Sequence, residues 1–492
     1  MKKLVMTVLG GLTAAFVVLA AILLVRAAGV ESVQPEVSAP QDLPEVDEGA
    51  VERLAGAVRI PTLSPAQYTD KQLAPFETLT DYLETSFPRV HAELDREKVG
   101  PCSLMYTWEG RDPEAKPAVL MSHLDVVPVE EGEEKDWTKP PFSGAVADGY
   151  VWGRGTLDIK AGVLGILEAT ETLLRAGAQP RHTFIFAFGC DEEIGGRRGA
   201  KEMAALLEKR GIEPAYVLDE GLVITEGMMP GVDKPVALVG LAEKGFMTLH
   251  LTAKAEGGHS SMPPNETAIG VLARAVKRLE DNQFDAELNA PARQMFEAVG
   301  PEMPMAMRVV FANLWLLEPV LIGQLEKKKQ TNATVRTTTA VTIFNAGVQD
   351  NVLPKTARAT VNFRIAPGQT RDDVMRHVEE VIDDERVEIQ AAEGSFNSNP
   401  SPVSSSQTPA FEHVRRTTRE IFGEETVVIP GLMVGGTDSR WFTDVADDVY
   451  RFIPMRLTAD DTKRIHGVDE RIGVENYKNI VRYYMQLMRA KK

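Results

Sequence analysis

The chain has 492 residues, of which 43% are hydrophobic and 25% are charged, and its formal net charge is −17 at pH 7. This length allows a large core and more than one domain. The negative charge argues against a nucleic-acid partner, because phosphate binding requires basic patches. We interpret the only tight basic cluster, Lys327-Lys328-Lys329, as a solvated face or loop. Nothing resembles a disulfide scaffold, and we predict that Cys102 and Cys190 are unpaired.

An apolar segment occupies the N-terminus. The uncharged run from Leu4 to Val25 is long enough to cross a bilayer as a helix, which needs about 20 residues. We predict a transmembrane anchor over residues 1–28, with a cytoplasmic N-terminus and an extracytoplasmic chain. The alternative is a signal peptide, whose removal would leave a secreted protein. Residues 29–48 are rich in proline and acids, which predicts a flexible linker.

Strand and helix patterns alternate from about residue 49 onward. This alternation predicts an α/β domain with a mostly parallel sheet that helices cover on both faces. The pattern changes near residue 242. If a long insertion at about 281–336 is left out, residues 242–397 read as βαββαβ, a ferredoxin-like α+β unit. The α/β pattern resumes over 398–492, so we expect one α/β domain, formed by 49–241 and 398–492, that a smaller domain interrupts.

Several polar residues follow directly after apolar strands, where open α/β sheets form their sites. His123 and Asp125 are two residues apart, so in extended backbone they point the same way. Asp158 ends a glycine-rich loop before a helix, and it could instead be a helix N-cap. The other candidates are the acidic triplet Asp191, Glu192 and Glu193 in "FAFGCDEEIGG", the pair Asp219 and Glu220 in "YVLDEG", and His466 in "KRIHGVDE".

These residues offer imidazole and carboxylate ligands and no sulfur. Such a set suits zinc, and also manganese or cobalt. One carboxylate can bridge two metals about 3.5–4 Å apart, and such pairs activate water for hydrolysis. One acid of the triplet would then bind a metal, while its neighbour accepts a proton from the activated water.

The motifs together resemble a known family. "SHLDVVP", "GRGTLDIKAG", "CDEEIGG", "VLDEG", "GGHSSMPP" and the late His466 are similar to those of the co-catalytic zinc exopeptidases, the family of glutamate carboxypeptidase, aminoacylase and succinyl-diaminopimelate desuccinylase. The closest resemblance is to the branch of carboxypeptidase S and the N-fatty-acyl-amino-acid hydrolases, and it covers the chain from about Val51 to Lys492. It implies two zinc ions per chain, and a smaller domain that acts as a lid and forms a homodimer.

The resemblance also implies a role for each metal ligand. His123 and Asp219 hold one zinc, Glu193 and His466 hold the other, and Asp158 bridges both. The residue spacing by itself does not separate Asp219 from Glu220. In the family, the peptide bond after the bridging aspartate, here Asp158–Ile159, is often cis.

The catalytic roles that the resemblance implies fall on three residues. Glu192 is the general base that takes a proton from the water and delivers it to the leaving amine. Asp125 does not bind a metal but orients or tunes the ligand His123. His259 stabilises the oxyanion, often from the partner subunit of a dimer, although a histidine beside glycine and serine is otherwise an ordinary loop residue. Cys190 stands where this branch usually has histidine.

Substrate contacts are implied at four further positions. Arg364 suits a terminal carboxylate, because its planar fork pairs with two oxygens. Asn351 could instead serve a turn, and Arg364 could simply pair with an acid. The four implied substrate-binding residues are Asn351, Arg364, Gly436 and Thr437.

The sequence therefore predicts a membrane-anchored zinc exopeptidase that hydrolyses the amide bond next to the C-terminal amino acid of small peptides. The alternative keeps this chemistry but hydrolyses or forms N-acyl amino acids. A remote alternative is a metal-free binding or assembly module.

Overall fold

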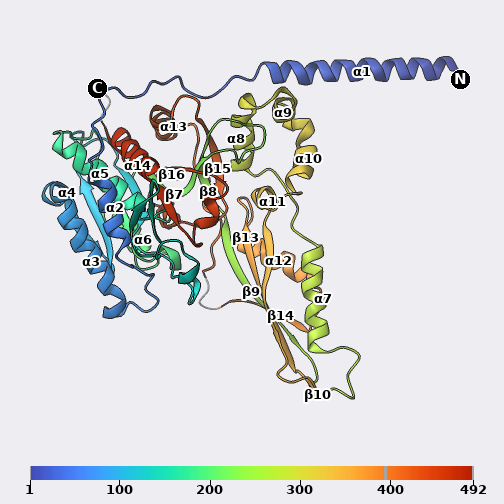
Figure 1. Cartoon of the computed structure of the whole chain (residues 1–492). Helices are drawn as coiled ribbons and strands as arrows, with labels where there is room; N and C mark the ends of the chain where they lie inside the picture. The colour runs from blue at the N-terminus through green and yellow to red at the C-terminus, as the bar shows by residue number, and fades with distance from the viewer. Residues whose placement is uncertain (1, 393–395, 490–492) are drawn as a thin grey trace.

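Figure 1 shows the computed structural model of the chain, which describes residues 2–392 and 396–489. A long N-terminal helix, α1 (Lys2–Ala28), and a narrower β-rich unit both extend from an α/β body. The main sheet of the body has eight strands in the order β1-β2-β6-β3-β7-β16-β8-β15. These strands are β1 (Asp95–Val99), β2 (Ser103–Trp108), β3 (Ala118–His123), β6 (Phe184–Gly189), β7 (Tyr216–Thr225), β8 (Val236–Glu243), β15 (Val427–Met433) and β16 (Val449–Leu457).

The main sheet is mixed, whereas the sequence predicts a mostly parallel sheet. Strands β6, β3, β7 and β16 are parallel neighbours in the centre, and β8 pairs with β15 in parallel at one edge. The pairs β1–β2, β2–β6 and β16–β8 are antiparallel. The short connection between β1 and β2 explains why these two strands are antiparallel. A tight turn allows only antiparallel pairing, whereas parallel neighbours need a long crossover.

Helices cover both faces of this sheet. One face packs against α5 and α14, and the other packs against α6 and a 3₁₀ turn at Asp438–Phe442. Alternate residues of β3 divide between the two cores, with Leu120 on the α5 side and Val119 on the α6 side. The helices of the body are α2 (Ala50–Val58), α3 (Asp70–Ser86), α4 (Pro88–Glu93), α5 (Lys160–Arg175), α6 (Ala200–Arg210), α13 (Pro409–Phe422) and α14 (Val474–Met488).

A small three-stranded sheet lies beside the main one. It consists of β4 (Ala145–Ala147), β5 (Tyr150–Trp152) and β17 (Arg471–Gly473), in the order β17-β5-β4. It joins the segment that follows His466 to the segment that precedes Asp158. Two site residues that are far apart in sequence are thereby fixed near each other.

The β-rich unit has its own core. Its antiparallel sheet has the order β11-β13-β9-β14, and the helices α7 and α12 pack on it, which gives the βαββαβ arrangement. A two-stranded ribbon, β10 (Gly258–His259) with β12 (Val352–Leu353), lies at the end of the unit farthest from the body (Figure 1). The elements are β9 (Gly245–Lys254), α7 (Ala268–Asp281), β11 (Thr338–Ala346), β13 (Thr356–Ile365), α12 (Arg371–Ile382) and β14 (Val387–Ala391). The domain boundaries and the role as a lid stay predictions.

The insertion at 281–336 folds as four helices, α8 (Ala290–Val299), α9 (Met305–Phe311), α10 (Leu314–Leu325) and α11 (Lys329–Val335). These helices interrupt the β-rich unit in sequence, but they pack on the edge of the main sheet. Phe296 and Phe311 share a core with Val236 of β8 and Ile429 of β15. The insertion thus belongs with the body in space.

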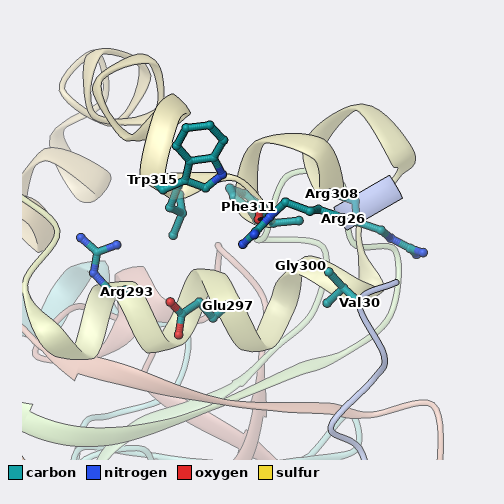
Figure 2. A pocket seen from close by; sticks show the side chains of 10 residues that line it. Arg26, Val30, Arg293, Glu297, Gly300, Arg308, Phe311 and Trp315 are labelled. Carbon is teal, nitrogen blue, oxygen red and sulfur yellow. Dashed lines mark hydrogen bonds between the residues drawn. The ribbon is translucent and has the colours of Figure 1, made fainter. Parts of the chain in front are cut away.

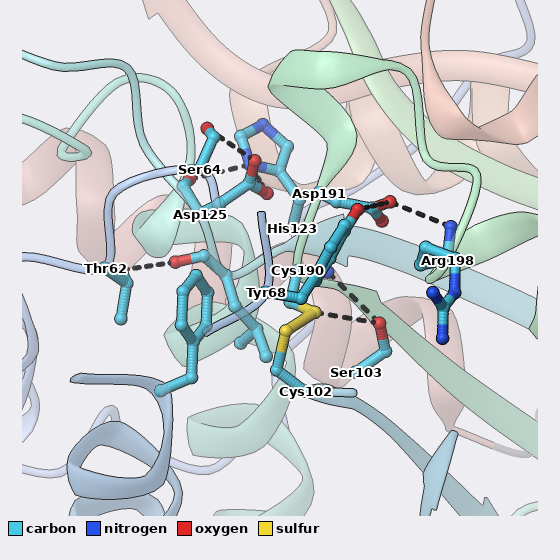
Figure 3. The surroundings of a disulfide bond; sticks show 12 residues. Thr62, Ser64, Tyr68, Cys102, Ser103, His123, Asp125, Cys190, Asp191 and Arg198 are labelled. Carbon is cyan, nitrogen blue, oxygen red and sulfur yellow. Dashed lines mark hydrogen bonds and ion pairs between the residues drawn. A yellow bond between two sulfur atoms is a disulfide. The ribbon is translucent and has the colours of Figure 1, made fainter. Parts of the chain in front are cut away.

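Cys102 and Cys190 form a disulfide, so the prediction of unpaired cysteines is wrong (Figure 3). In the antiparallel pair β2–β6, Leu104 lies opposite Phe188, and the same register places Cys102 opposite Cys190 with their Cα atoms 5.7 Å apart. The bond closes over a separation of 88 residues. Only the tertiary pairing of β2 with β6 reveals this contact.

Helix α1 has the length and apolar composition of a membrane span over Lys3–Ala28, and a signal sequence would have the same properties. Its C-terminal end lies against α9. The predicted flexible linker that follows is extended along the body. Its Gln34 side chain exchanges two hydrogen bonds with the backbone of Val428, at 2.9 and 3.0 Å. Arg419 also donates to the carbonyl of Pro35 at 3.0 Å.

Candidate metal centre

The carboxyl ends of the central parallel strands converge on one group of polar side chains. His123 is the last residue of β3, and a 3₁₀ turn at Glu192–Ile194 follows β6 directly. His123 Nε2 lies 3.0 Å from Asp158 Oδ1, and Asp158 comes from the glycine-rich loop before α5. Because parallel strands present their carboxyl ends at one edge, residues that are distant in sequence meet here.

His466 completes this group from the C-terminal part of the chain. Its Nε2 atom lies 3.0 Å from Asp158 Oδ2 and 3.2 Å from Glu193 Oε2. The two oxygens of Asp158 therefore face different imidazoles, as a carboxylate that bridges two metals does. The peptide bond between Asp158 and Ile159 is cis, as the resemblance implies.

The pair Asp219 and Glu220 in β7 divides into two environments. Both oxygens of Asp219 accept backbone N–H groups, from Ser439 at 2.8 Å and from Glu220 at 2.9 Å. The carboxylate of Glu220 instead lies within 4.8 Å of ligand atoms of His123 and Glu192. The structure thus brings Glu220 into the group of potential ligands, whereas Asp219 lies beside it in a network of backbone donors.

Asp125 contacts both His123 and the acidic triplet, and Figure 3 shows it beside His123. His123 Nδ1 lies 2.9 Å from the carbonyl of Asp125, so an Nδ1–H donor would leave Nε2 free to bind a metal. The carboxylate of Asp125 accepts the backbone N–H groups of Glu192 at 3.1 Å and of Glu193 at 3.2 Å. Asp125 therefore orients one predicted ligand and also holds the turn that carries the predicted base and another predicted ligand.

Asp191, the first acid of the triplet, supports the same turn. It is buried, and its carboxylate accepts the Tyr68 hydroxyl and the Arg198 backbone N–H, both at 2.8 Å. Burial raises its pKa above the ordinary value. Each acid of the triplet thus has a different environment, and the side chain of Asp191 points away from the metal ligands into the loop.

A buried ion pair that the sequence did not reveal holds the backbone of two predicted ligands, Asp158 and His466. Glu470 and Arg154 are both buried, and Arg154 Nη1 donates to Glu470 Oε2 at 2.6 Å. Glu470 Oε1 accepts the backbone N–H groups of Gly155 at 2.9 Å, Leu157 at 2.8 Å and Asp158 at 3.3 Å. Arg154 also donates to the carbonyl of His466 at 3.1 Å. "HGVDE" already places Glu470 near His466, but sequence could not show its partners.

The hydrogen-bond partners of Glu470 favour its ionised form. Burial raises its pKa to about 7, while Arg154 and the backbone of Leu157 oppose that shift. Every hydrogen-bond partner described above is a donor, so an added proton on the carboxyl group would find no acceptor among them. The charged carboxylate is the form that this environment fits.

The residues of the group fit a pair of metal ions. Burial raises the pKa values of Glu192 and Glu220 well above the ordinary value, and neighbouring carboxylates add to the shift. The Oε1 atom of Glu193 is buried and has no hydrogen-bond partner among the described residues. Crowded, buried carboxylates and two imidazoles without sulfur form a donor set that suits zinc, manganese or cobalt.

The charge of His466 depends on the same neighbours. Its contacts with Asp158 and Glu193 raise the pKa of its imidazole to about 10. The pKa of Asp158 is lowered, because hydrogen bonds from both histidines outweigh the effect of burial. The imidazole and carboxylate atoms that meet here are the atoms that would contact a metal ion.

A cleft of about 590 Å³ opens over the group, and the body and the β-rich unit both line it. Arg364 of β13 and Phe246 of β9 come from the β-rich unit, and the Arg364 guanidinium lies 4.5 Å from the centre of the Phe246 ring. Arg440 of the body lies 4.0 Å from Glu192 Oε1, beside Gly436. The cleft can therefore hold a negatively charged group next to the potential metal ligands.

His259, Asn351 and Thr437, which the resemblance places in contact with the substrate, do not line this cleft. His259 is exposed in β10, and its neighbour across the ribbon is Val352, next to Asn351. The Ser260 N–H donates to the Asn351 carbonyl at 3.1 Å, so the structure brings these predicted residues together at the far end of the β-rich unit. Thr437 is fully buried and binds Glu243 through its N–H at 2.9 Å, which makes it part of the loop framework.

Comparison with known proteins places this chain in a family of peptidases. The model of peptidase family M20/M25/M40 matches residues 119–490. The N-fatty-acyl-amino acid synthase/hydrolase PM20D1 of Xenopus tropicalis is 42% identical over 491 residues, which cover 98% of this chain and 94% of that protein. The probable carboxypeptidase S-like 2 of Dictyostelium discoideum is 41% identical, with 89% and 84% covered. Carboxypeptidase S of Saccharomyces cerevisiae is 31% identical, with the same shares covered. These matches confirm the branch that the motifs indicate.

Solved structures share the fold. An M20 family metallo-carboxypeptidase from Sulfolobus solfataricus superposes with a TM-score of 0.65 at 18% identity, covering 90% of this chain and 98% of that one. Human carnosine dipeptidase 1 gives a TM-score of 0.62 at 16% identity, with 90% and 96% covered. The mixed α/β architecture is therefore that of this family.

Proposed function

We propose that this chain, a hydrolase that belongs to peptidase family M20/M25/M40, uses two zinc ions to cleave the amide bond next to an amino acid with a free carboxylate. The observation that carries the proposal is the Asp158 carboxylate, whose oxygens each lie 3.0 Å from a different imidazole, that of His123 or of His466. Glu192 lies beside this group and is available as a base. Manganese or cobalt would suit the same donors.

The ligands would be His123, Asp158, Glu193 and His466, with a fifth carboxylate from the pair Asp219 and Glu220. When bound, two zinc ions would polarise the scissile carbonyl and lower the pKa of water toward about 7. The Glu192 carboxylate would accept a proton from the attacking water and pass it to the nitrogen of the leaving amine. Asp125 would keep His123 and the turn at Glu192 in place.

The carboxylate of the substrate would bind the arginines of the cleft. Arg364 offers a planar pair of donors, and its stacking on Phe246 limits its motion. Arg440 lies deeper, next to Glu192. Small peptides and N-acyl amino acids both carry this carboxylate, so the arginines serve either substrate.

Both substrate classes have support. A carboxypeptidase S relative favours small peptides, and the N-fatty-acyl-amino acid relative favours acyl amino acids. Ile453, Met455 and Leu457 line the cleft and would suit an acyl chain. Comparing the hydrolysis of a dipeptide such as glycyl-leucine with that of a long-chain N-acyl leucine separates the two, because the acyl substrate would gain from apolar contacts that the dipeptide lacks.

We further propose a homodimer through the β-rich unit. Its edge strand β11 exposes Ile343 and Phe344, and an exposed apolar edge favours pairing with another chain. His259 of the partner subunit would then reach the cleft and stabilise the oxyanion, since the chain's own His259 lies outside it. Helix α1 would anchor this assembly to a membrane with the cleft on the extracytoplasmic side, or would be removed as a signal.

The substitution Glu192→Gln tests the mechanism. It keeps the shape of the side chain but removes its basicity, so we expect turnover to fall by about 10²–10⁴-fold, the usual contribution of a general base. Two metal ions per chain should remain, as measured by mass spectrometry. Glu131→Gln, at an exposed acid, is the matched control and should change neither the turnover nor the metal content. An active Glu192→Gln variant would refute the mechanism, and a metal-free, inactive wild-type chain would favour a binding module.

A further inference from the structure

Helix α10 is apolar on both of its faces. Leu314, Leu321 and Leu325 are buried in the core of the insertion. On the opposite face Trp315 is 61% exposed and Val320 is 56% exposed, with Leu316 between them. A helix that is hydrophobic all round is normally covered by protein or by lipid. Within residues 2–392 and 396–489, this face has no protein cover.

The neighbouring helix α1 indicates where this face lies. Asn313, at the break between α9 and α10, donates to the Leu23 carbonyl of α1 at 3.1 Å. Arg26 of α1 donates to the Ala312 carbonyl at 3.4 Å. The exposed face of α10 therefore lies beside the end of α1, where an inserted α1 would leave a bilayer (Figure 1).

Helices α9 and α10 together are apolar enough for a membrane segment, but they meet at 112°. Each is too short to cross a bilayer alone, since crossing requires about 20 residues. A short apolar helix beside a membrane anchor is suited to lie in the plane of the interface, with one face in the lipid.

The charges around α10 suit a phospholipid surface. A cavity of about 390 Å³ between α1 and the insertion is lined by Arg26, Arg308 and Trp315 (Figure 2). Tryptophan is enriched at the level of lipid headgroups, and arginine side chains near the ends of membrane helices extend toward that level. The exposed cluster Lys327–Lys329 follows directly after α10, in a chain whose net charge is −17. Lysines beside an apolar helix attract anionic headgroups.

We propose that α9 and α10 dock on the surface of an anionic phospholipid bilayer. Trp315, Leu316 and Val320 lie in the boundary between headgroups and acyl chains, and Lys327–Lys329 contact the phosphates. The geometry rests on the proposed anchor α1. Because the linker is hydrogen-bonded along the body, α1 and α10 hold the protein at two points, which fixes the orientation of the body on the membrane.

The test uses the full-length chain in vesicles of phosphatidylcholine and phosphatidylglycerol that contain brominated acyl chains. Bromine quenches tryptophan only at contact, so part of the fluorescence should be lost on incorporation. This quenched component should disappear in Trp315→Phe, but it should persist in the matched control Trp108→Phe, whose tryptophan is buried in β2. Replacing Lys327–Lys329 by glutamines should reduce the quenching in anionic vesicles and leave it unchanged in neutral ones.

The possible outcomes are distinguishable. If the chain floats with the vesicles but Trp315→Phe leaves the quenching unchanged, the anchor proposal stands and the docking proposal is overturned. A chain that does not float would overturn both, without bearing on the hydrolase activity. If Trp315→Glu instead converts dimers to monomers and bromine never quenches, a second copy covers this face and the proposal fails.

Discussion

Reduction of the disulfide between Cys102 and Cys190 should strongly destabilise the folded chain. The bond closes a loop over a separation of 88 residues. In the chain-entropy relation, closing a loop of this length lowers the conformational entropy of the unfolded chain. This loss stabilises the folded state by about 4.6 kcal/mol at 25 °C. Whole domains are stable by only about 5–15 kcal/mol, so the loss is a large fraction of the total. Cys190 also precedes the acidic triplet, so the turn that carries Glu192 should loosen first.

The measurement is urea unfolding, followed by tryptophan fluorescence, with chains refolded in the presence or absence of a phosphine reductant. The oxidised chain should have the higher midpoint, and activity after mild heating should fall faster in the reduced chain. The double variant Cys102→Ala with Cys190→Ala should respond to the reductant in neither assay, which controls for other effects of the reagent. Two titratable thiols in the native, untreated protein would refute the reasoning, as would equal midpoints with and without reductant.

Further substitutions test the site. Glu470→Gln leaves the guanidinium of Arg154 buried without its carboxylate, and removal of one partner from such a pair costs about 3–5 kcal/mol. Urea unfolding should show this loss, whereas Asp460→Asn, in an exposed pair, should leave the unfolding midpoint nearly unchanged. Arg364→Gln should raise KM about 10–100-fold for substrates with a free carboxylate, the range for a charge-assisted hydrogen bond, while an amidated substrate should be hydrolysed equally by both enzymes. Metal content shows which residue of the pair in β7 is the fifth ligand. Glu220→Gln should lose metal if the Glu220 carboxylate is that ligand, whereas a loss of metal only in Asp219→Asn would assign the role to Asp219.

The sequence predicted the parts of the site that short motifs carry. His123 and Glu193 come at or just after the ends of apolar strands, Asp158 ends a glycine-rich loop, and parallel strands bring such residues to one edge. His466 is indicated by the motif resemblance. Motif position alone could not separate Asp219 from Glu220, because adjacent residues differ only in the direction of their side chains. That direction depends on the N–H of Ser439, which is distant in sequence and binds Asp219.

The parts that the sequence did not predict depend on pairings between distant segments. The disulfide requires β2 to pair with β6, and the antiparallel pairs β1–β2, β2–β6 and β16–β8 make the main sheet mixed. The insertion at 281–336 follows a helix of the β-rich unit, so its sequence position suggests that unit. Its apolar residues instead complete the exposed edge at β8 and β15, because that edge offers apolar surface that would otherwise face water.

The cleft combines two sets of groups whose supports are separate. Asp158 and His466 are fixed within the body by the buried pair of Arg154 and Glu470. Arg364 instead comes from β13, in a sheet with its own core. A displacement of the β-rich unit would therefore change the proposed contact of Arg364 with the carboxylate of the substrate, while the distances among the proposed metal ligands stay fixed. Substitutions on β13 should act mainly on KM, and substitutions at the buried pair should act on kcat and on stability together.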